Sequence, residues 1–143
     1  VTDKRTYLRH SHVMYPTPYY SAMEYINSSL PHDAKVLFLG ESRGYYCERK
    51  FIATSAFAQN PLISIIAESK GPDEAHGRLQ DLGVTHLFVN REEIERLKGA
   101  GFFARSSEKS FYAFVEKHLR LLYEDRRRDR LAPMWVQVYA LHL

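Results

Sequence analysis

The stretch Lys35-Val36-Leu37-Phe38-Leu39-Gly40-Glu41-Ser42-Arg43-Gly44 decides the fold. Its four consecutive large apolar residues show no alternation of apolar and polar positions. An unbroken apolar run of this kind is typical of a strand that is covered on both faces. Such a strand needs helices above and below it, so we predict that it lies at the centre of an α/β sheet. The polar turn that follows would then lie at the carboxyl end of the strand, where α/β domains usually bind ligands.

Helices and strands follow one another on both sides of this stretch. A cap residue and a proline mark helix starts at Thr17-Pro18 and Asn60-Pro61, and Asn90 with an acid three residues on marks another. Apolar residues then recur every three or four positions, which is the period of an amphipathic helix. The predicted helices cover residues 18–30, 62–69, 72–82, 91–98 and 107–118, and the predicted strands cover residues 35–39, 51–54, 84–89, 119–123 and 135–141.

The order of these elements predicts a single α/β domain over residues 17–143, after a lead-in of residues 1–16 without a clear period. Helices interleaved with apolar strands indicate a three-layer Rossmann-like sheet that is mostly parallel. Only a charged connector, residues 124–133, separates the last two strands. We therefore expect these two strands to form an antiparallel pair at one edge of the sheet.

Composition bounds the class of protein. The chain has 143 residues, of which 45% are hydrophobic and 26% charged, as expected for one globular domain with a core. Its formal charge of +3 is too small to imply a nucleic-acid partner. No run of about 18 apolar residues occurs, so the sequence predicts no membrane span. The chain begins at Val1 without methionine or a signal-peptide pattern, which indicates a piece of a longer protein.

Polar residues at the ends of two predicted strands form the candidate site. Glu41, Ser42 and Arg43 follow the first strand. Asn90 and Arg91 follow the strand at residues 84–89. Because the carboxyl ends of parallel strands meet at one edge of a sheet, we expect these side chains to face one crevice. Arg43 would clamp an anion, while Glu41 and Asn90 would orient hydroxyl groups. The pattern is neither G-x-G-x-x-G nor a P-loop, so a tight turn held by hydrogen bonds stays the commoner alternative.

Other reactive side chains do not form a catalytic set. Glu41 and Glu48 would suit acid–base chemistry only if they met in space, which the sequence does not indicate. His10 and His12 are two potential ligands where a metal site needs more. Cys47, the single cysteine, is better explained as a small, partly buried hydrophobe than as an activated thiol. We therefore predict no catalytic residue, no metal site and no cofactor in this chain.

The charged connector contains a run of basic residues. Arg126, Arg127, Arg128 and Arg130 could meet phosphate groups of anionic lipid or of nucleic acid. Aromatic residues are not interleaved with the run, so a solvated hairpin loop is favoured and nucleic acid is not.

Three segments of the sequence resemble a known family. Leu30-Pro-His-Asp-Ala-Lys-Val36 leads into Gly40-Glu-Ser-Arg-Gly-Tyr-Tyr46, and the later segments are Leu82-Gly-Val-Thr-His-Leu-Phe-Val-Asn90 and Leu122-Tyr-Glu-Asp125. In this layout the chain resembles, from about Tyr19 to Leu143, the C-terminal domain of polytopic membrane glycosyltransferases. These are the dolichyl-phosphate-mannose–protein mannosyltransferase-like and aminoarabinose-transferase-like proteins.

The resemblance implies several things that the residues alone do not. The family's catalytic acids lie in loops between membrane helices, so this domain would be inactive in isolation and residues 1–16 would link it to a preceding membrane region. It would lie at the extracytoplasmic face of the cell membrane, which is periplasmic in a Gram-negative cell. Its partners would be the membrane domain of the same polypeptide and an anionic lipid or lipid-linked sugar that binds the four arginines of the connector.

Two other functions stay open from the sequence. A free-standing Rossmann-like domain could bind a nucleotide or phosphosugar at the same turn. A structural or protein-interaction module would need no ligand at all.

Overall fold

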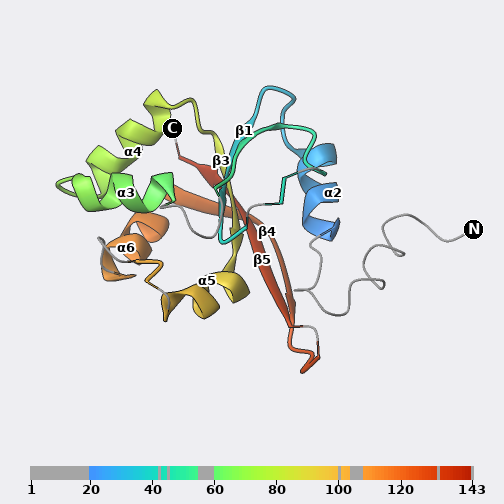
Figure 1. Ribbon diagram of the computed structural model, residues 1–143. Helices are drawn as coiled ribbons and strands as arrows, with labels where there is room; N and C mark the ends of the chain where they lie inside the picture. The colour runs from blue at the N-terminus through green and yellow to red at the C-terminus, as the bar shows by residue number, and fades with distance from the viewer. Residues whose placement is uncertain are drawn as a thin grey trace, which may run out of the picture.

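The computed structural model describes residues 20–41, 43–44, 46–54, 60–99, 101–103, 108–131 and 133–142. These residues form a five-stranded sheet with helices on both of its faces (Figure 1). The helices are α2 (Tyr20–Ser29), α3 (Pro61–Glu68), α4 (Pro72–Asp81), α5 (Arg91–Lys98) and α6 (Glu108–His118). The strands are β1 (Lys35–Leu39), β2 (Lys50–Ile52), β3 (His86–Asn90), β4 (Leu119–Arg127) and β5 (Met134–Leu141).

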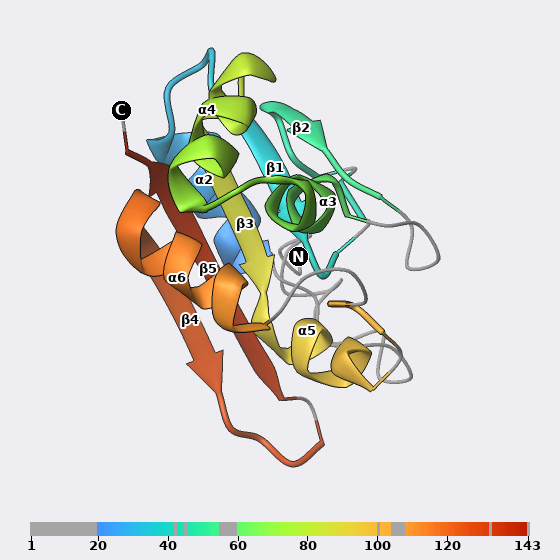
Figure 2. The ribbon, with the colours of Figure 1, turned by 90° about the vertical axis from the view of Figure 1, so that its left-hand side faces the viewer.

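The sheet is mixed. Its strands lie in the order β2-β1-β3-β5-β4. β1 pairs in parallel with both β2 and β3, whereas β5 is antiparallel to both β3 and β4. Figure 2 shows the sheet behind the helices of one face, with β4 and β2 at its two edges. The carboxyl ends of β1, β3 and β4 therefore lie at the same end of the sheet as the start of β5.

The prediction of a three-layer Rossmann-like domain with a mostly parallel sheet is wrong. Half of the strand pairs are antiparallel, and the antiparallel strands β4 and β5 are the longest, with 9 and 8 residues. None of the described residues between β1 and β2 is helical, so this pair is not a Rossmann-type βαβ unit. The alternation of helices and strands misled the prediction because it does not record which strands pair or in which direction.

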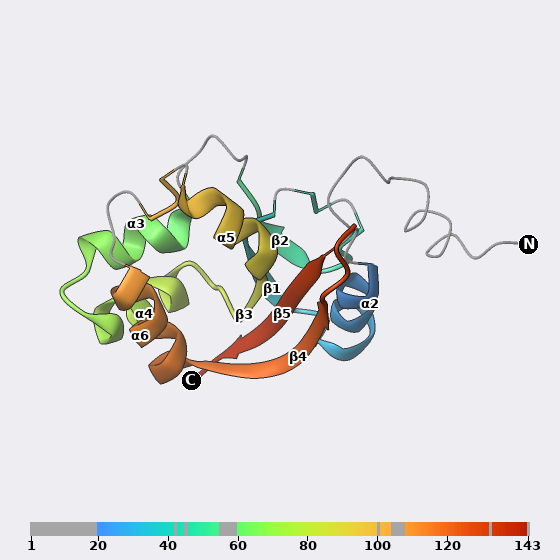
Figure 3. The same cartoon turned by 90° about the horizontal axis from the view of Figure 1, so that it is seen from below.

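Burial of β1 confirms the expectation on which the architecture was built. Val36, Leu37, Phe38 and Leu39 are all 0% exposed. Leu37 and Leu39 belong to the larger apolar cluster, which packs under α3, α4, α5 and α6. Val36 and Phe38 belong to the smaller cluster under α2. Seen from below, the sheet separates α2 from α3, α4 and α6 (Figure 3).

The last hairpin differs from its prediction in length. β4 runs to Arg127 rather than ending at Tyr123, because Glu124 pairs with Gln137 and Arg126 with Trp135 across the antiparallel ladder. The four consecutive charged residues from Glu124 to Arg127 are compatible with such pairing, because β4 is an edge strand. Within the described ranges, no helix is both long and apolar enough to cross a membrane.

Candidate functional site

The turn after β1 approaches the end of β3 closely. Gly40 has φ +75°, a conformation that glycine adopts without steric cost. A Cβ atom at this position would lie 2.7 Å from the carbonyl oxygen of Asn90 and 3.1 Å from Cγ1 of Ile94. The absence of a side chain at Gly40 therefore lets Glu41 reach the carboxyl end of β3.

Glu41 and Arg43 form an ion pair inside this turn. The Nε of Arg43 donates to Oε1 of Glu41 at 2.5 Å, and its Nη2 donates to Oε2 at 3.1 Å. The backbone N–H of Arg43 donates to the same carboxylate at 3.2 Å. The Glu41 side chain is only 6% exposed, while that of Arg43 is 30% exposed. The arrangement therefore presents the guanidinium toward solvent and keeps the carboxylate inside.

Asn90 joins this ion pair to helix α5. Its Nδ2 donates to Oε2 of Glu41 at 3.3 Å, and its Oδ1 accepts from the backbone N–H of Glu93 at 3.2 Å. The second bond is the N-cap that the sequence predicted, so this part of the prediction is confirmed. Asn90 is 5% exposed and all its side-chain bonds bridge β1, β3 and α5. We call Glu41, Arg43 and Asn90 the turn cluster.

Arg91 lies apart from the turn cluster although it follows Asn90 directly. Its Nη1 donates to Oε1 of Gln137 at 3.3 Å and its Nη2 to the hydroxyl of Tyr112 at 3.1 Å. The guanidinium also lies 4.4 Å from the centre of the Trp135 ring. The Nε of Arg91 is buried and has no hydrogen-bond partner among the described atoms. Arg91 thus braces β5 against α6 instead of facing the turn.

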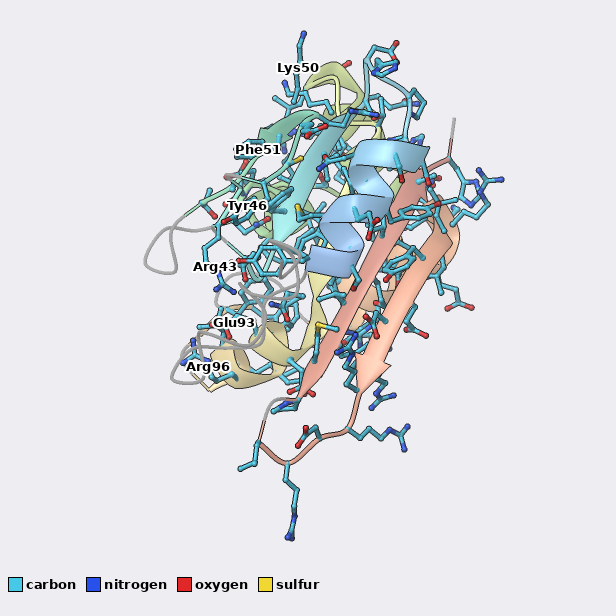
Figure 4. The ribbon with its side chains drawn as sticks, turned by 90° about the vertical axis from the view of Figure 1, so that its right-hand side faces the viewer. Arg43, Tyr46, Lys50, Phe51, Glu93 and Arg96 are labelled. Atoms are coloured by element: carbon cyan, nitrogen blue, oxygen red, sulfur yellow. The ribbon has the colours of Figure 1, made fainter. Side chains whose placement is uncertain are left out.

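The five predicted site residues therefore separate. The structure brings Glu41, Arg43 and Asn90 together and directs Arg91 elsewhere. Ser42 lies outside the described residues. In Figure 4, Glu93 and Arg96 lie toward the end of the domain from which the hairpin projects, Lys50 lies toward the other end, and Arg43 lies between them. Glu93 forms an ion pair with Arg96, and this hydrogen bonding raises the pKa of the Arg96 guanidinium.

Arg49 is a structural residue that sequence reasoning missed. It is 8% exposed and lies just before β2. Its Nη2 donates to the carbonyl oxygen of Asn27 at 2.7 Å and to that of Leu30 at 3.0 Å. Its Nε donates to the carbonyl oxygen of Pro31 at 2.9 Å. These carbonyls lie at the carboxyl end of α2, where a cation is favoured by the helix dipole.

The loop that contains Arg49 is also held from α2. Nδ2 of Asn27 donates to the Tyr46 carbonyl at 2.9 Å, and Oδ1 of Asn27 accepts from the Glu48 backbone N–H at 2.7 Å. Cys47 is partly buried in this loop and packs against the cluster under α2, as predicted. Burial raises the pKa of the Cys47 thiol, so the structure does not support an activated thiolate there.

The histidines described here have structural surroundings. His118 hydrogen-bonds Oδ1 of Asp73 at 2.8 Å, and hydrogen bonds from Lys117 and His118 lower the pKa of the Asp73 carboxyl. Burial, assisted by Arg120, lowers the pKa of His86. Among the described residues, no group of three or more His, Cys, Asp and Glu could hold a metal ion.

The arginines of the last hairpin divide into two pairs. Arg126 and Arg127 belong to β4, where the Arg126 guanidinium lies 3.9 Å from the Trp135 ring centre and Arg127 lies 3.6 Å from Oδ2 of Asp125. Arg128 and Arg130 lie beyond the strand and are exposed. The run that the sequence treats as one unit is therefore half strand and half loop.

Comparison with known proteins shows similarity in structure but not in sequence. No protein-family model matches the chain, and no curated protein matches it. Among solved structures, the chain is similar to the C-terminal globular domain of oligosaccharyltransferase from Archaeoglobus fulgidus, with a TM-score of 0.51 and 13% identity. The similarity covers 86% of this chain and 96% of that domain. At this identity the comparison shows a shared fold.

Proposed function

We propose that this chain is the C-terminal globular domain of a membrane-embedded glycosyltransferase-like protein and is not catalytic by itself. The observation that carries the proposal is the similarity to an oligosaccharyltransferase C-terminal domain across 96% of that domain's length. The segments that resemble dolichyl-phosphate-mannose–protein mannosyltransferase-like and aminoarabinose-transferase-like proteins support the same class from different data. On this proposal the domain lies at the extracytoplasmic face, and residues 17–143 follow a linker from the membrane region.

Within this function we assign the turn cluster to binding a ligand of the parent enzyme. The Glu41 carboxylate accepts four hydrogen bonds from Arg43 and Asn90, which hold it between the turn and the end of β3. This supports a positioning role for Glu41 and Asn90. The partly exposed Arg43 guanidinium is then the group that meets an anionic ligand, such as the phosphate of a lipid-linked sugar or a carboxylate of the acceptor.

The first test is the gene upstream of Val1. The proposal expects that segment to encode several hydrophobic helices, each of about 20 residues. A reading frame that opens shortly before Val1 and encodes no such helix would contradict the proposal that the chain belongs to a membrane-embedded protein.

The second test uses the full-length protein and its transfer activity. Arg43→Lys keeps a cation beside Glu41 but loses the planar fork that binds a phosphate or carboxylate with two hydrogen bonds. We expect the KM for the anionic substrate to rise on the order of tenfold, which corresponds to one lost charge-assisted bond. Arg78→Lys, at an exposed ion pair on α4, is the matched control. Unchanged kinetics in Arg43→Lys would leave the domain a structural or interaction module.

A further inference from the structure

The hairpin that joins β4 to β5 projects from the body of the domain. β4 ends at Arg127 and β5 begins at Met134, and residues 128–131 extend beyond the rest of the sheet (Figure 2). We call residues 128–131 the hairpin tip. In it, the backbone N–H of Leu131 donates to Oδ1 of Asp129 at 2.9 Å, which closes a local turn.

A large apolar side chain lies at this tip. Leu131 is 93% exposed, whereas the next most exposed large hydrophobic residue among those described, Leu121, is 47% exposed. Isolated exposed leucines are common on protein surfaces. Leu131 differs because it stands on a projecting turn and directly follows an exposed arginine, Arg130.

The basic excess of the chain is concentrated at the same place. Residues 126–131 contain four arginines and one aspartate, a net charge of +3, which equals the formal charge of the whole chain. The positive and negative formal charges of the remaining residues are therefore equal in number. Arg126 and Arg127 are engaged with Trp135 and Asp125. In the described part of the chain, Arg128 and Arg130 have no ion-pair or hydrogen-bond partner.

Side-chain contacts between β4 and β5 hold the base of the hairpin in place, and this fixes the position of the tip. Oε2 of Glu124 accepts from Nε1 of Trp135 at 2.9 Å and from Nε2 of Gln137 at 2.5 Å. The guanidinium groups of Arg91 and Arg126 both lie against the Trp135 ring, at 4.4 and 3.9 Å from its centre. Cation–π contacts of this kind add to the pairing of the two strands.

The tip projects from the end of the sheet that bears the turn cluster. Asn90 at the end of β3 pairs with Val136, and Arg127 at the end of β4 pairs with Met134. β1 runs parallel to β3, so Glu41 and Arg43 follow the strand at that same end. A flat surface that contacts the tip therefore faces this end of the domain.

We propose that the hairpin tip docks on an anionic lipid bilayer, with Leu131 at the acyl boundary and Arg128 and Arg130 at the lipid phosphates. A bilayer surface offers both an apolar layer and a plane of phosphate groups, and this pairing matches an exposed leucine that directly follows Arg130 and lies three residues after Arg128. Nucleic acid offers phosphate but no apolar layer for Leu131. One side chain and two cations give weak, salt-sensitive binding, since stable anchoring needs a second signal.

The proposal is tested by sedimentation of the chain with vesicles at low ionic strength. We expect binding to vesicles of equimolar phosphatidylcholine and phosphatidylglycerol, little binding to phosphatidylcholine alone, and release by added salt. Replacing both tip arginines in Arg128→Gln/Arg130→Gln should lower the partition coefficient on the order of tenfold or more. Leu131→Ser should weaken it several-fold.

A charge-matched variant controls for net charge. Arg120 and Lys50 are exposed and lie at the opposite end of their strands, so Arg120→Gln/Lys50→Gln removes the same two charges away from the tip. We expect this variant to keep most of the vesicle binding. Equal loss in both double variants, equal binding to neutral and anionic vesicles, or binding to an oligonucleotide but not to vesicles would each overturn the proposal. The vesicle assay does not involve Arg43, so its failure is separate from failure of the proposed function.

Discussion

Arginines in two regions of this domain have opposite environments. Arg49, in the loop between β1 and β2, is 8% exposed and donates to three backbone carbonyls at the end of α2. Arg128 and Arg130, at the hairpin tip, are exposed and have no partner among the described residues. One arginine therefore completes the fold, and the other two are available to a surface outside it.

The comparison shows why clustering in sequence is a poor guide to an arginine's role. The sequence analysis proposed a role for the run of arginines and no structural role for Arg49. Yet carbonyls at a helix end must find donors when the chain buries them. Arg49, next to the end of α2, is therefore structural. Arg128 and Arg130, at the hairpin tip, donate to no such carbonyl among the described residues.

We expect the largest change in the free energy of unfolding from a substitution at Arg49. Arg49→Met keeps most of the aliphatic stem but removes the guanidinium that donates to the carbonyls of Asn27, Leu30 and Pro31. We expect the free energy of unfolding to fall by about 2–4 kcal/mol, because bonds from a charged donor are lost where water is excluded. Urea denaturation measures the change. Arg130→Met is the control and should stay within about 0.5 kcal/mol of the wild type; similar losses in both would remove the contrast.

The next effect concerns the turn that positions Arg43. Gly40→Ala places a Cβ atom 2.7 Å from the Asn90 carbonyl at a residue with φ +75°. We expect a loss of about 1–3 kcal/mol in unfolding free energy, from backbone strain and displacement of the turn.

A second glycine tests whether this loss is specific to the turn. Gly77 lies inside α4, and a Cβ atom there would meet nothing within 4 Å. Gly77→Ala should therefore stabilise the domain by about 0.5–1 kcal/mol, because alanine favours the helix. If both substitutions had the same sign, the close approach of Gly40 to Asn90 would not be what selects glycine.

At the base of the hairpin we expect a smaller contribution to the free energy of unfolding, and this contribution depends on pH. Hydrogen bonds from Trp135 and Gln137 lower the pKa of Glu124 from its ordinary value of 4.5. The ionised carboxylate therefore adds stability above that pH, and the contribution is lost as the pH falls through and below it. Glu124→Gln should cost about 1 kcal/mol or less at neutral pH, since the group is largely exposed to solvent.

Urea denaturation at several pH values checks this prediction. The difference between wild type and Glu124→Gln should shrink toward zero in acid, where the wild-type carboxyl is protonated. Glu116→Gln, on the exposed face of α6, should give a small difference at every pH. A gap between wild type and Glu124→Gln that widened in acid would contradict the assigned role of the carboxylate.

The smallest expected effect is at the hairpin tip itself. Arg128→Gln/Arg130→Gln should change the unfolding free energy by no more than about 0.5 kcal/mol, because neither side chain has a partner within the described fold. Thermal unfolding of the wild type and the double variant gives the comparison. A clear loss of stability would mean that these arginines act inside the fold, as Arg49 does, rather than on an external surface.

Local patterns in the sequence were sufficient for several features. The unbroken apolar run predicted a strand over Lys35–Leu39 that is buried on both faces, and the structure has the same bounds. Asn60 and Asn90 each accept a hydrogen bond from the helix that follows, as their cap patterns predicted. The meeting of Glu41 with Asn90 followed from the ends of two adjacent parallel strands. These features depend on residues within one element or on a simple rule about strand ends.

Only the tertiary structure decided the rest. The sequence predicted that β4 and β5 pair antiparallel, but nothing in it indicated that β5 also pairs antiparallel with β3. That second pairing makes half of the strand pairs antiparallel. Arg91 leaves the predicted crevice because its partners, Tyr112 and Gln137, lie 21 and 46 residues away in the chain. Helix caps and the apolar pattern of a buried strand depend on residues close together in the sequence, so the sequence alone can predict them. The direction in which strands pair and the partners of side chains depend on segments far apart in the chain, and only the packing of those segments determines them.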